Sequence, residues 1–275
     1  MGISIRSLSS LDEYIACEDL QRRVWAMPDD LEVVPLHLLV AVERSGGLLL
    51  GAFEGSELVG FVFGLPGLAK GGKVKHYSHM MAVAPRYQSA GIGYRLKLAQ
   101  RDFVLSQGID LVTWTYDPLE SRNAYLNIHK LGAVSRTYIR DCYGPLTDGL
   151  SAGLPSDRLQ VDWWITSAGR GQRRTRTAVQ PQAGKVLQVN ETGRMGAGLL
   201  TPGVLRLDTK TPLVQVEIPA DYQSIKEADS DLALAWRQAT REIFEFYFAS
   251  DYSAVDFYSH RVEGTRRSFY VLQAG

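Results

Sequence analysis

The chain of 275 residues carries 30 basic and 30 acidic side chains, and 45% of its residues are hydrophobic. This composition is typical of a soluble globular protein that is long enough for one large domain or two small ones, each with its own core. A chain with no net charge is not built mainly to hold nucleic acid, so the composition argues against that class of protein.

The hydrophobic periodicity predicts strands and helices in an irregular order. In chain order, we expect a strand over 3–5, helices over 11–25 and 35–44, strands over 48–53, 58–65 and 74–83, a helix over 91–107, a strand over 111–116, a helix over 121–131 and a strand over 133–140. Gly132 is well placed to cap the last of these helices. This order predicts a mixed α/β unit rather than a doubly wound sheet with strict alternation.

Targeting segments and metal-ligand patterns are not apparent. The sequence has no run of about 18 apolar residues that could cross a membrane, and its N-terminus, MGISIRSLSSLDEY, lacks the basic and apolar regions of a signal peptide. Cys17 and Cys142 lie far apart and near no paired histidines, so we expect neither a metal site nor a disulfide framework. These features favour a cytoplasmic protein.

The composition changes after residue 145. We expect a first domain over 1–145, an irregular linker over 146–184 and a C-terminal α/β region over 185–275. The linker contains the arginine-rich segment SAGRGQRRTRTAVQPQAG, residues 167–184, which is typical of a solvated loop; a polynucleotide contact or a clamp on a phosphate are the alternatives. The preceding segment RLQVDWWITS predicts a strand with one buried face.

The C-terminal region echoes an earlier part of the chain. The order of strand, proline, Tyr-Gln-Ser, helix and strand occurs around residues 81–116 and again around 216–258, which suggests a degenerate half-copy, although any strand–helix–strand unit shows some likeness. The second copy has no glycine in its loop, so we expect one phosphate site per chain. The aromatic helix over 232–248 has more apolar surface than one stripe buries, and we expect the region to dock on the first domain.

The loop over 88–93 lies between an apolar strand and an amphipathic helix. Apolar residues of that helix recur at offsets of four, seven and eleven, which predicts one buried stripe: Ile92, Leu96, Ala99 and Phe103. Gly91 and Gly93 let the backbone approach a ligand closely. The loop therefore offers backbone N–H groups and the positive end of a helix, which is how proteins bind phosphate without a metal. The alternative is an ordinary strand-to-helix turn.

The segment MAVAPRYQSAGIGYRLKLAQRDFVLSQGIDLVTWTYDPLESRNAYLNIHKLGAV resembles the acetyl-CoA-binding core of the GNAT superfamily of N-acetyltransferases. Its loop matches the pyrophosphate motif of that family, Q/R-x-x-G-x-G/A, at Gln88, Ser89, Ala90, Gly91, Ile92 and Gly93. The resemblance covers residues 1–145 and implies that the strands over 76–83 and 110–116 splay apart to admit the pantetheine arm of the cofactor. The whole chain also resembles a bacterial group of proteins of about 270 residues with GNAT-like N-terminal halves.

The resemblance also implies which groups bind acetyl-CoA. Backbone groups of Met81 and Val83 would contact the pantetheine and the thioester, and N–H groups from Gln88 to Gly93 would hold the pyrophosphate. The family often carries a tyrosine near the end of the helix over 121–131 as the general acid. Ile128 stands at that position here, so Tyr125, Tyr116 or Asn127 would have to take over.

We count Asn127 among the candidate cofactor contacts. The family's motif over this helix is N-x-x-A-x-x-x-Y-x-K-x-G-F, and two further departures from it lie at its ends. Ser121 stands where the family has asparagine, and Ala133 replaces a phenylalanine, whereas Ala124 and Lys130 match.

Amide formation from a thioester needs a base for the amine, donors for the developing oxyanion and an acid for the thiolate. Alternate residues of a strand share a face, so we expect His79 to lie on the same face as Met81 and Val83, beside the thioester. The ordinary pKa of histidine, near 6.5, suits a base at neutral pH. His79, like His76 on the other face, could equally be a structural histidine.

Two carboxylates after the next strand compete for the role of base. Asp117 and Glu120 follow the strand over 111–116, although loop carboxylates are more often solvated or helix-capping. We therefore take His79, Tyr125 and Asp117 as the candidate catalytic residues.

Three classes of function remain open from the sequence. The first is an acyl-CoA-dependent N-acyltransferase, transferring acetyl or succinyl to the amine of a small molecule or amino acid. The second is a CoA-binding protein without turnover, which the missing tyrosine favours. The third is an RNA-associated protein that uses the arginine-rich loop, although we expect no nucleic acid and no membrane as partner. A homodimer is left open.

Overall fold

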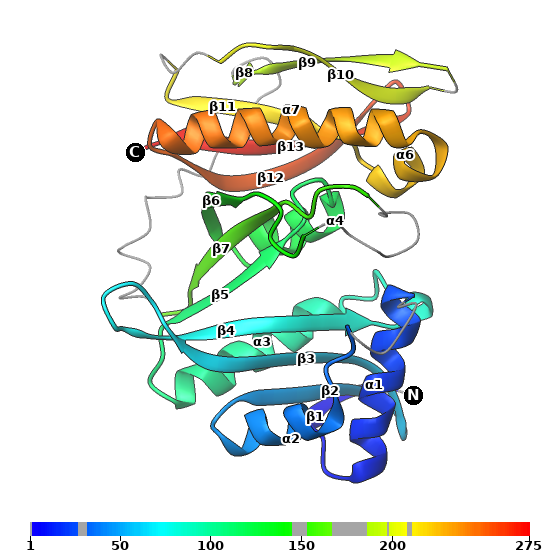
Figure 1. Ribbon diagram of the computed structural model, residues 1–275, viewed down its shortest axis with the longest axis vertical. Helices are drawn as coiled ribbons and strands as arrows, with labels where there is room; N and C mark the ends of the chain where they lie inside the picture. Colours follow the sequence, from blue (N-terminus) through cyan, green and yellow to red (C-terminus); the bar gives the residue numbers. More distant parts are fainter. Residues whose placement is uncertain (1, 27–31, 145–152, 167–185, 197, 208–210) are drawn as a thin grey trace. The chain divides into compact units, whose positions relative to one another are not determined.

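The computed structural model describes residues 2–26, 32–144, 153–166, 186–196, 198–207 and 211–275. The chain forms two compact units: unit 1 comprises Met1–Trp114 and Trp164–Arg170, and unit 2 comprises Thr115–Trp163 and Gly171–Gly275. Both combine a sheet with helices, so the predicted mixed α/β class is confirmed (Figure 1). The domain boundary at residue 145 stays a prediction, and the arginine-rich loop lies outside the described residues.

Unit 1 is built on a sheet whose strands follow one another in chain order. The order is β1 (Ile3–Ser7), β2 (Leu48–Glu54), β3 (Glu57–Leu68), β4 (Val74–Val83) and β5 (Leu111–Tyr116). The first four strands pair antiparallel, whereas β4 and β5 are parallel and are joined by the helix α3 (Ile92–Ser106). A parallel pair needs such a crossover, and this one begins with the loop after β4.

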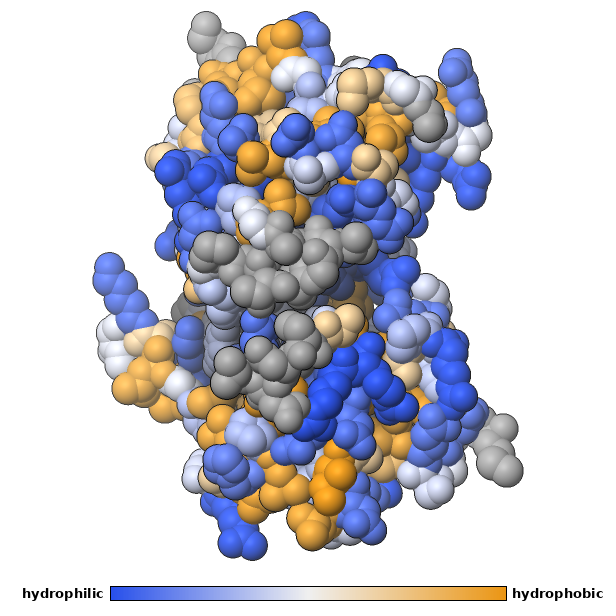
Figure 2. All heavy atoms as spheres, turned by 45° about the vertical axis from the view of Figure 1, so that its right-hand side comes forward, coloured by the Kyte–Doolittle hydropathy of each residue, from blue (hydrophilic) through white to orange (hydrophobic). Residues whose placement is uncertain are grey.

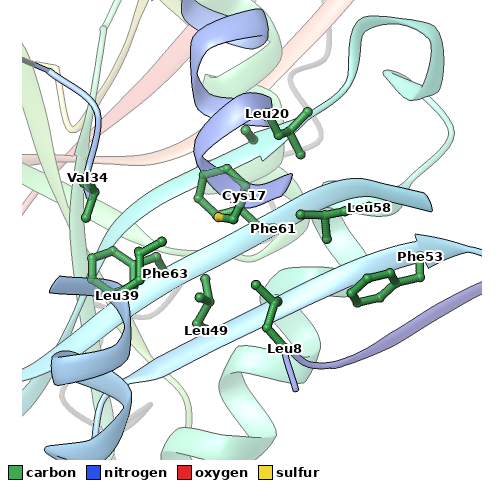
Figure 3. Packing of buried hydrophobic residues seen from close by; sticks show 11 residues of the cluster. Leu8, Cys17, Leu20, Val34, Leu39, Leu49, Phe53, Leu58, Phe61 and Phe63 are labelled. Atoms are coloured by element: carbon green, nitrogen blue, oxygen red, sulfur yellow. The ribbon is translucent and has the colours of Figure 1, made fainter. Parts of the chain in front are cut away.

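Two apolar clusters cover the two faces of this sheet. On one face, α1 (Leu11–Trp25) and α2 (Leu36–Arg44) pack on β2 and β3, and Figure 3 shows residues of both helices against Phe61 and Phe63. On the other face, Ile92 and Leu96 of α3 pack against Val62 of β3. The stripe predicted for α3 is therefore the one that contacts the sheet.

Unit 2 contains six strands in hydrogen-bonded order and a two-stranded ribbon. The sheet order is β7 (Arg158–Trp164), β6 (Val134–Ile139), β12 (Tyr252–Val262), β13 (Thr265–Ala274), β11 (Leu213–Ile218) and β8 (Leu187–Gln188). The ribbon pairs β9 (Asn190–Met195) with β10 (Leu199–Leu205). Residues of β7 alternate between buried and half-buried, as expected for a strand with one buried face.

The helices of unit 2 include one that the sequence predicted differently. We expected a single helix over 121–131, but α4 is a four-residue α-helix (Ser121–Ala124) that continues as a π-helix, Tyr125–Lys130. Gly132 follows with a φ of 66°, consistent with its predicted role at the helix end. The other helices in the described part of unit 2 are α6 (Tyr222–Ala228) and α7 (Ser230–Ala249).

The aromatic helix α7 packs on both sides within unit 2. Trp236 donates from Nε1 to the carbonyl oxygen of Leu200 in the ribbon, at 2.8 Å. The ring of Phe244 lies 6.1 Å from that of Tyr138 in β6 and 5.1 Å from that of Tyr270 in β13. The C-terminal region therefore packs against residues 134–139, and its docking on residues 1–114 stays a prediction.

The suggested half-copy repeats the order of elements but not the sheet. Strands β4 and β5 pair directly with each other, whereas β13 lies between β11 and β12 and pairs antiparallel with both. A parallel pair that could part to admit a ligand is therefore present in unit 1 and is replaced in unit 2 by a closed three-strand arrangement.

The surface that Figure 2 displays has apolar residues interspersed with hydrophilic ones. No helix within the described residues is both long and apolar enough to cross a membrane. In the same part of the chain, no cluster of three or more histidine, cysteine, aspartate or glutamate residues could hold a metal ion.

Candidate active site

Strand β4 carries a β-bulge at His79. Its pairing with β3 runs in register from Gly60–Val83 to Phe63–Met80, and then continues from Gly64 to Ser78, so that His79 has no partner in β3. A bulge of this kind inserts one residue into a strand, bends it and changes which side chains share a face.

The bulge corrects one expectation from the sequence. Met81 and Val83 pack on the α3 face of the sheet, whereas the ring of His79 lies 5.9 Å from that of Phe63, on the α1 and α2 face. His79 therefore does not share a face with Met81 and Val83, because the extra residue interrupts the alternation. His79 is an exposed residue, but one side of its ring lies against the rings of Phe63 and Tyr77. This partial loss of solvent lowers the pKa of His79 below 6.5.

The parallel pairing between β4 and β5 is short. It consists of His76 with Val112 and Tyr77 with Thr113, although β4 continues for six residues beyond Tyr77. Beyond this pair, β4 is bonded to β3 on one side, and no pairing with β5 follows within unit 1. The backbone edge of β4 that carries Met81 and Val83 is therefore available to a ligand.

The loop after β4 leads directly into α3. Gly91 is the N-cap residue of α3, with a φ of 78°, and no side chain caps this helix. A Cβ atom on Gly91 would meet nothing within 4 Å, so the backbone is open on that side. The first N–H groups of a helix have no acceptor within the helix. Ser89 also has a positive φ, of 68°.

The same loop is tied to the end of β4. Gln88 donates from Nε2 to the carbonyl oxygen of Val83, at 3.3 Å. The residues from Gln88 to Gly93, with Ala90 and Ile92 among them, therefore form one continuous turn from the free edge of β4 to the start of α3. An anionic group at this turn would meet N–H groups and the positive end of a helix dipole.

Four polar side chains are buried beneath the point where β4 and β5 part. They are His76 and Ser78 of β4, and Lys97 and Gln100 of α3. Gly64 of β3 leaves room for them, because a Cβ atom there would come within 2.3 Å of Nε2 of His76. This cluster could not be predicted from the sequence, because a lysine and a glutamine beside an apolar stripe are typical of the solvated face of a helix.

Asp117 lies in unit 2 as the partner of a buried arginine. Its two carboxylate oxygens accept hydrogen bonds from Arg237, at 2.8 and 2.6 Å, and the N–H group of Leu119 donates to Oδ1. Burial alone would raise the pKa of Asp117, but the Arg237 guanidinium outweighs it and holds the pKa below its ordinary value. Both oxygens are engaged, which is unfavourable for a base. Glu120 is instead hydrogen-bonded to Gln223, and burial raises its pKa.

Tyr125 begins the π-helix of unit 2. Its ring stacks on that of His129 at a centroid distance of 4.9 Å, and Nδ1 of His129 lies 2.9 Å from Oδ1 of Asp256. Ile128, which stands at the position of the family's tyrosine, is completely buried, and Asn127 is also buried. Of these residues, Tyr125 lines a surface pocket.

That pocket has a volume of about 310 Å³, and its lining is cationic and polar: Tyr125, Ser259, His260, Arg261 and Arg266. Arg261 donates to the carbonyl oxygen of Gly264, and Arg266 lies 3.4 Å from the hydroxyl of Ser259. Both of these partners are neutral, so these contacts leave the positive charges of the two guanidinium groups unbalanced, and an anionic group could bind there.

Solved structures with a similar chain path were found among acetyltransferases. One is the ribosomal-protein-S18-alanine N-acetyltransferase from Escherichia coli, with 19% identity over 60% of this chain and 95% of that chain, and a TM-score of 0.47. Another belongs to the NatC complex bound to Gag peptide and CoA, with 16% identity over 60% of this chain and all of that chain, and a TM-score of 0.49. The matching structures are acetyltransferases of the GNAT family.

A GNAT structure from Desulfovibrio desulfuricans matches at 16% identity over 60% of this chain and all of that chain, with a TM-score of 0.48. No protein-family model matches the chain, and no curated protein does.

Proposed function

We propose that the protein is an acyl-CoA-dependent N-acyltransferase that transfers an acetyl or succinyl group to the amine of a small molecule or amino acid. The observation that carries this proposal is the continuity of three features in unit 1. Strand β4 has a free edge after Tyr77, it ends in a loop with open backbone at Gly91, and the loop starts a helix that no side chain caps.

These features fit the chemistry of CoA. The loop from Gln88 to Gly93 would hold the pyrophosphate through N–H groups other than those of Gln88 and Ala90, which donate to the carbonyl oxygens of Pro85 and Tyr87. The free edge of β4 at Met81 and Val83 would hydrogen-bond the amides of the pantetheine arm as an added strand does. Asn127 would be a further contact, as the resemblance to the GNAT family implies. The acyl group that CoA brings is the electrophile of the reaction.

The candidate base and acid come from different parts of the chain. Burial lowers the pKa of His79, which favours the neutral imidazole that can accept the proton of an amine. Tyr125 is the candidate acid for the departing thiolate, since it lines a pocket whereas Ile128 is buried. Asp117 would keep Arg237 in place rather than act as a base.

The proposed acceptor is a small molecule or an amino acid, and the proposed reaction takes place in the cytoplasm. Within unit 2, the pocket beside Tyr125 would suit an anionic group, because Arg261 and Arg266 line it.

Calorimetric titration with CoA tests the proposal. Replacement of Gly91 by valine places a branched side chain at the backbone where the pyrophosphate would lie, and we expect CoA affinity to fall more than about tenfold. The matched control is Gly108→Val at the other end of α3, because Gly108 has a similar φ, of 73°, and equally open surroundings. Equal CoA affinities of the two folded variants would contradict the assignment of the loop.

A CoA-binding protein without turnover is the second candidate. The observation that favours it is the complete burial of Ile128 where the family carries its tyrosine. Thiol release from acetyl-CoA and succinyl-CoA in the presence of a panel of amines separates the two candidates. Release that depends on the amine supports the enzyme, and binding without release supports the second candidate.

A further inference from the structure

Lys97 is a buried cation at the point where β4 and β5 part. Its Nζ atom donates to Oγ of Ser78, at 2.7 Å, and lies 3.8 Å from the centre of the Trp114 ring. Ser78 and Trp114 are the first residues of β4 and β5 beyond the last bonded pair, Tyr77 with Thr113. The ammonium group therefore closes, from the α3 side, the vertex of the gap between the two strands.

The positive charge of Lys97 has no negative partner among the described residues. Only 2% of the residue is exposed, and its hydrogen bonds within the described chain go to neutral oxygens, those of Ser78 and Gln100. Buried ammonium groups are normally paired with an acid. The lack of one is consistent with the effect of burial, which lowers the pKa of Lys97 to about 7.

Beside Lys97, the directions of the hydrogen bonds leave the Nδ1 atom of His76 as a donor without an acceptor among the described residues. Because the ammonium donates to Oε1 of Gln100, at 3.2 Å, the amide nitrogen of Gln100 must donate to Nε2 of His76, at 3.1 Å. The proton of the neutral His76 ring then lies on Nδ1, which is buried and has no partner among the described residues. The cluster thus holds a charge that its neutral oxygens do not balance and an N–H group with no acceptor among the described residues.

We propose that Lys97 recognises the free carboxylate of the acyl group, so that the acyl donor is the CoA monothioester of a short dicarboxylic acid, of the succinyl or malonyl class. This inference rests on the proposed function, because it takes the acyl-CoA to lie along the free edge of β4. The pyrophosphate loop follows the C-terminal end of β4, and the bonded vertex lies towards the other end. An acyl group at the far end of the pantetheine arm therefore points towards Lys97.

Comparison of two four-carbon thioesters tests this inference. Succinyl-CoA and butyryl-CoA have acyl chains of equal length, and only the first ends in a carboxylate. In calorimetric titrations without acceptor, we expect the wild-type protein to bind succinyl-CoA at least about tenfold more tightly, the effect of one charge-assisted hydrogen bond. Lys97→Met should abolish this preference, whereas Arg101→Met on the same helix, which removes a cation paired with Asp102, should retain it.

The outcomes separate this inference from the proposed function. Equal binding of the two thioesters by the wild-type protein, or a preference that survives in Lys97→Met, overturns the role of Lys97 even where CoA itself binds. Failure of the wild-type protein to bind CoA overturns the proposed function as well. Methionine preserves the length of the side chain and removes a buried charge, a change that folds tolerate well. If the variant fails to fold, the comparison of succinyl-CoA with butyryl-CoA on the wild-type protein still tests whether the acyl carboxylate is recognised.

Discussion

Asp117 and Arg237 form an ion pair in unit 2, and we expect replacement of the one to destabilise the protein more than replacement of the other. The side chain of Arg237 is 1% exposed and that of Asp117 is 16% exposed. Asp117→Asn keeps the shape of the side chain but leaves a buried guanidinium without a counter-charge, and we expect the free energy of unfolding to fall by about 3 kcal/mol. Arg237→Met leaves a carboxylate that is partly solvated and lies 3.9 Å from Arg158, so the loss should be smaller, about 2 kcal/mol.

Urea unfolding of the two single variants and of the double variant measures this directly. If the pair acts as a unit, the double variant should lose less than the sum of the two single losses, by about 1 kcal/mol or more. Because the folded pKa of Asp117 lies below its ordinary value of 3.8, the stabilisation should be present at neutral pH and disappear as the pH falls through the folded pKa. Additive losses, or a loss below about 1 kcal/mol for Asp117→Asn, would refute this account of the pair.

Three further predictions concern unit 1 and the helix caps. Gly64→Ala should prevent normal folding or lower the melting temperature strongly, because a Cβ atom would clash with His76 and with the carbonyl oxygen of Tyr77. The control is Gly67→Ala in the same strand, which has open surroundings and should change the melting temperature little. Asp229→Ala should lower the free energy of unfolding by about 1 kcal/mol, since Asp229 caps α7 by accepting from the N–H group of Leu232; a change near zero in urea unfolding would contradict that role. The folded pKa of Lys97 is about 7 and its ordinary value is 10.5, so the unfolded state binds more protons between these values and stability should rise with pH across this window. Lys97→Met should remove that rise, and an unchanged pH profile would show that the ammonium is not desolvated.

The elements predicted best from the sequence are those whose signals are local. The spans of β4 and β5 and of the helix over 11–25 agree with the structure, because hydrophobic periodicity and flanking turns define them. The loop over 88–93 was likewise found from its glycines and from the strand and helix on either side. Its conformation, with Gly91 in the left-handed region, is one that glycine adopts without strain.

The features that the sequence could not predict depend on contacts with distant residues. The bulge at His79 is one extra residue opposite Gly64, and the alternation of a strand contains no mark of it. The π-helix follows α4 where Ser121 donates to the carbonyl oxygen of Ala220 and where His129 meets Asp256, both contacts with the C-terminal region. A periodicity of 3.6 residues cannot report such contacts in advance.

Two buried cations among the described residues, Arg237 and Lys97, differ in a way that separates structure from function. In unit 2, Arg237 is matched by the carboxylate of Asp117 whether or not a ligand is present. In unit 1, the hydrogen bonds of Lys97 to described residues go to neutral groups, beside the edge of β4 that faces away from β3. Folding gains nothing from leaving a buried charge uncompensated, because a methionine would pack there without the desolvation penalty. An unmatched ammonium is therefore better explained by a ligand that brings the missing negative charge than by the stability of the fold.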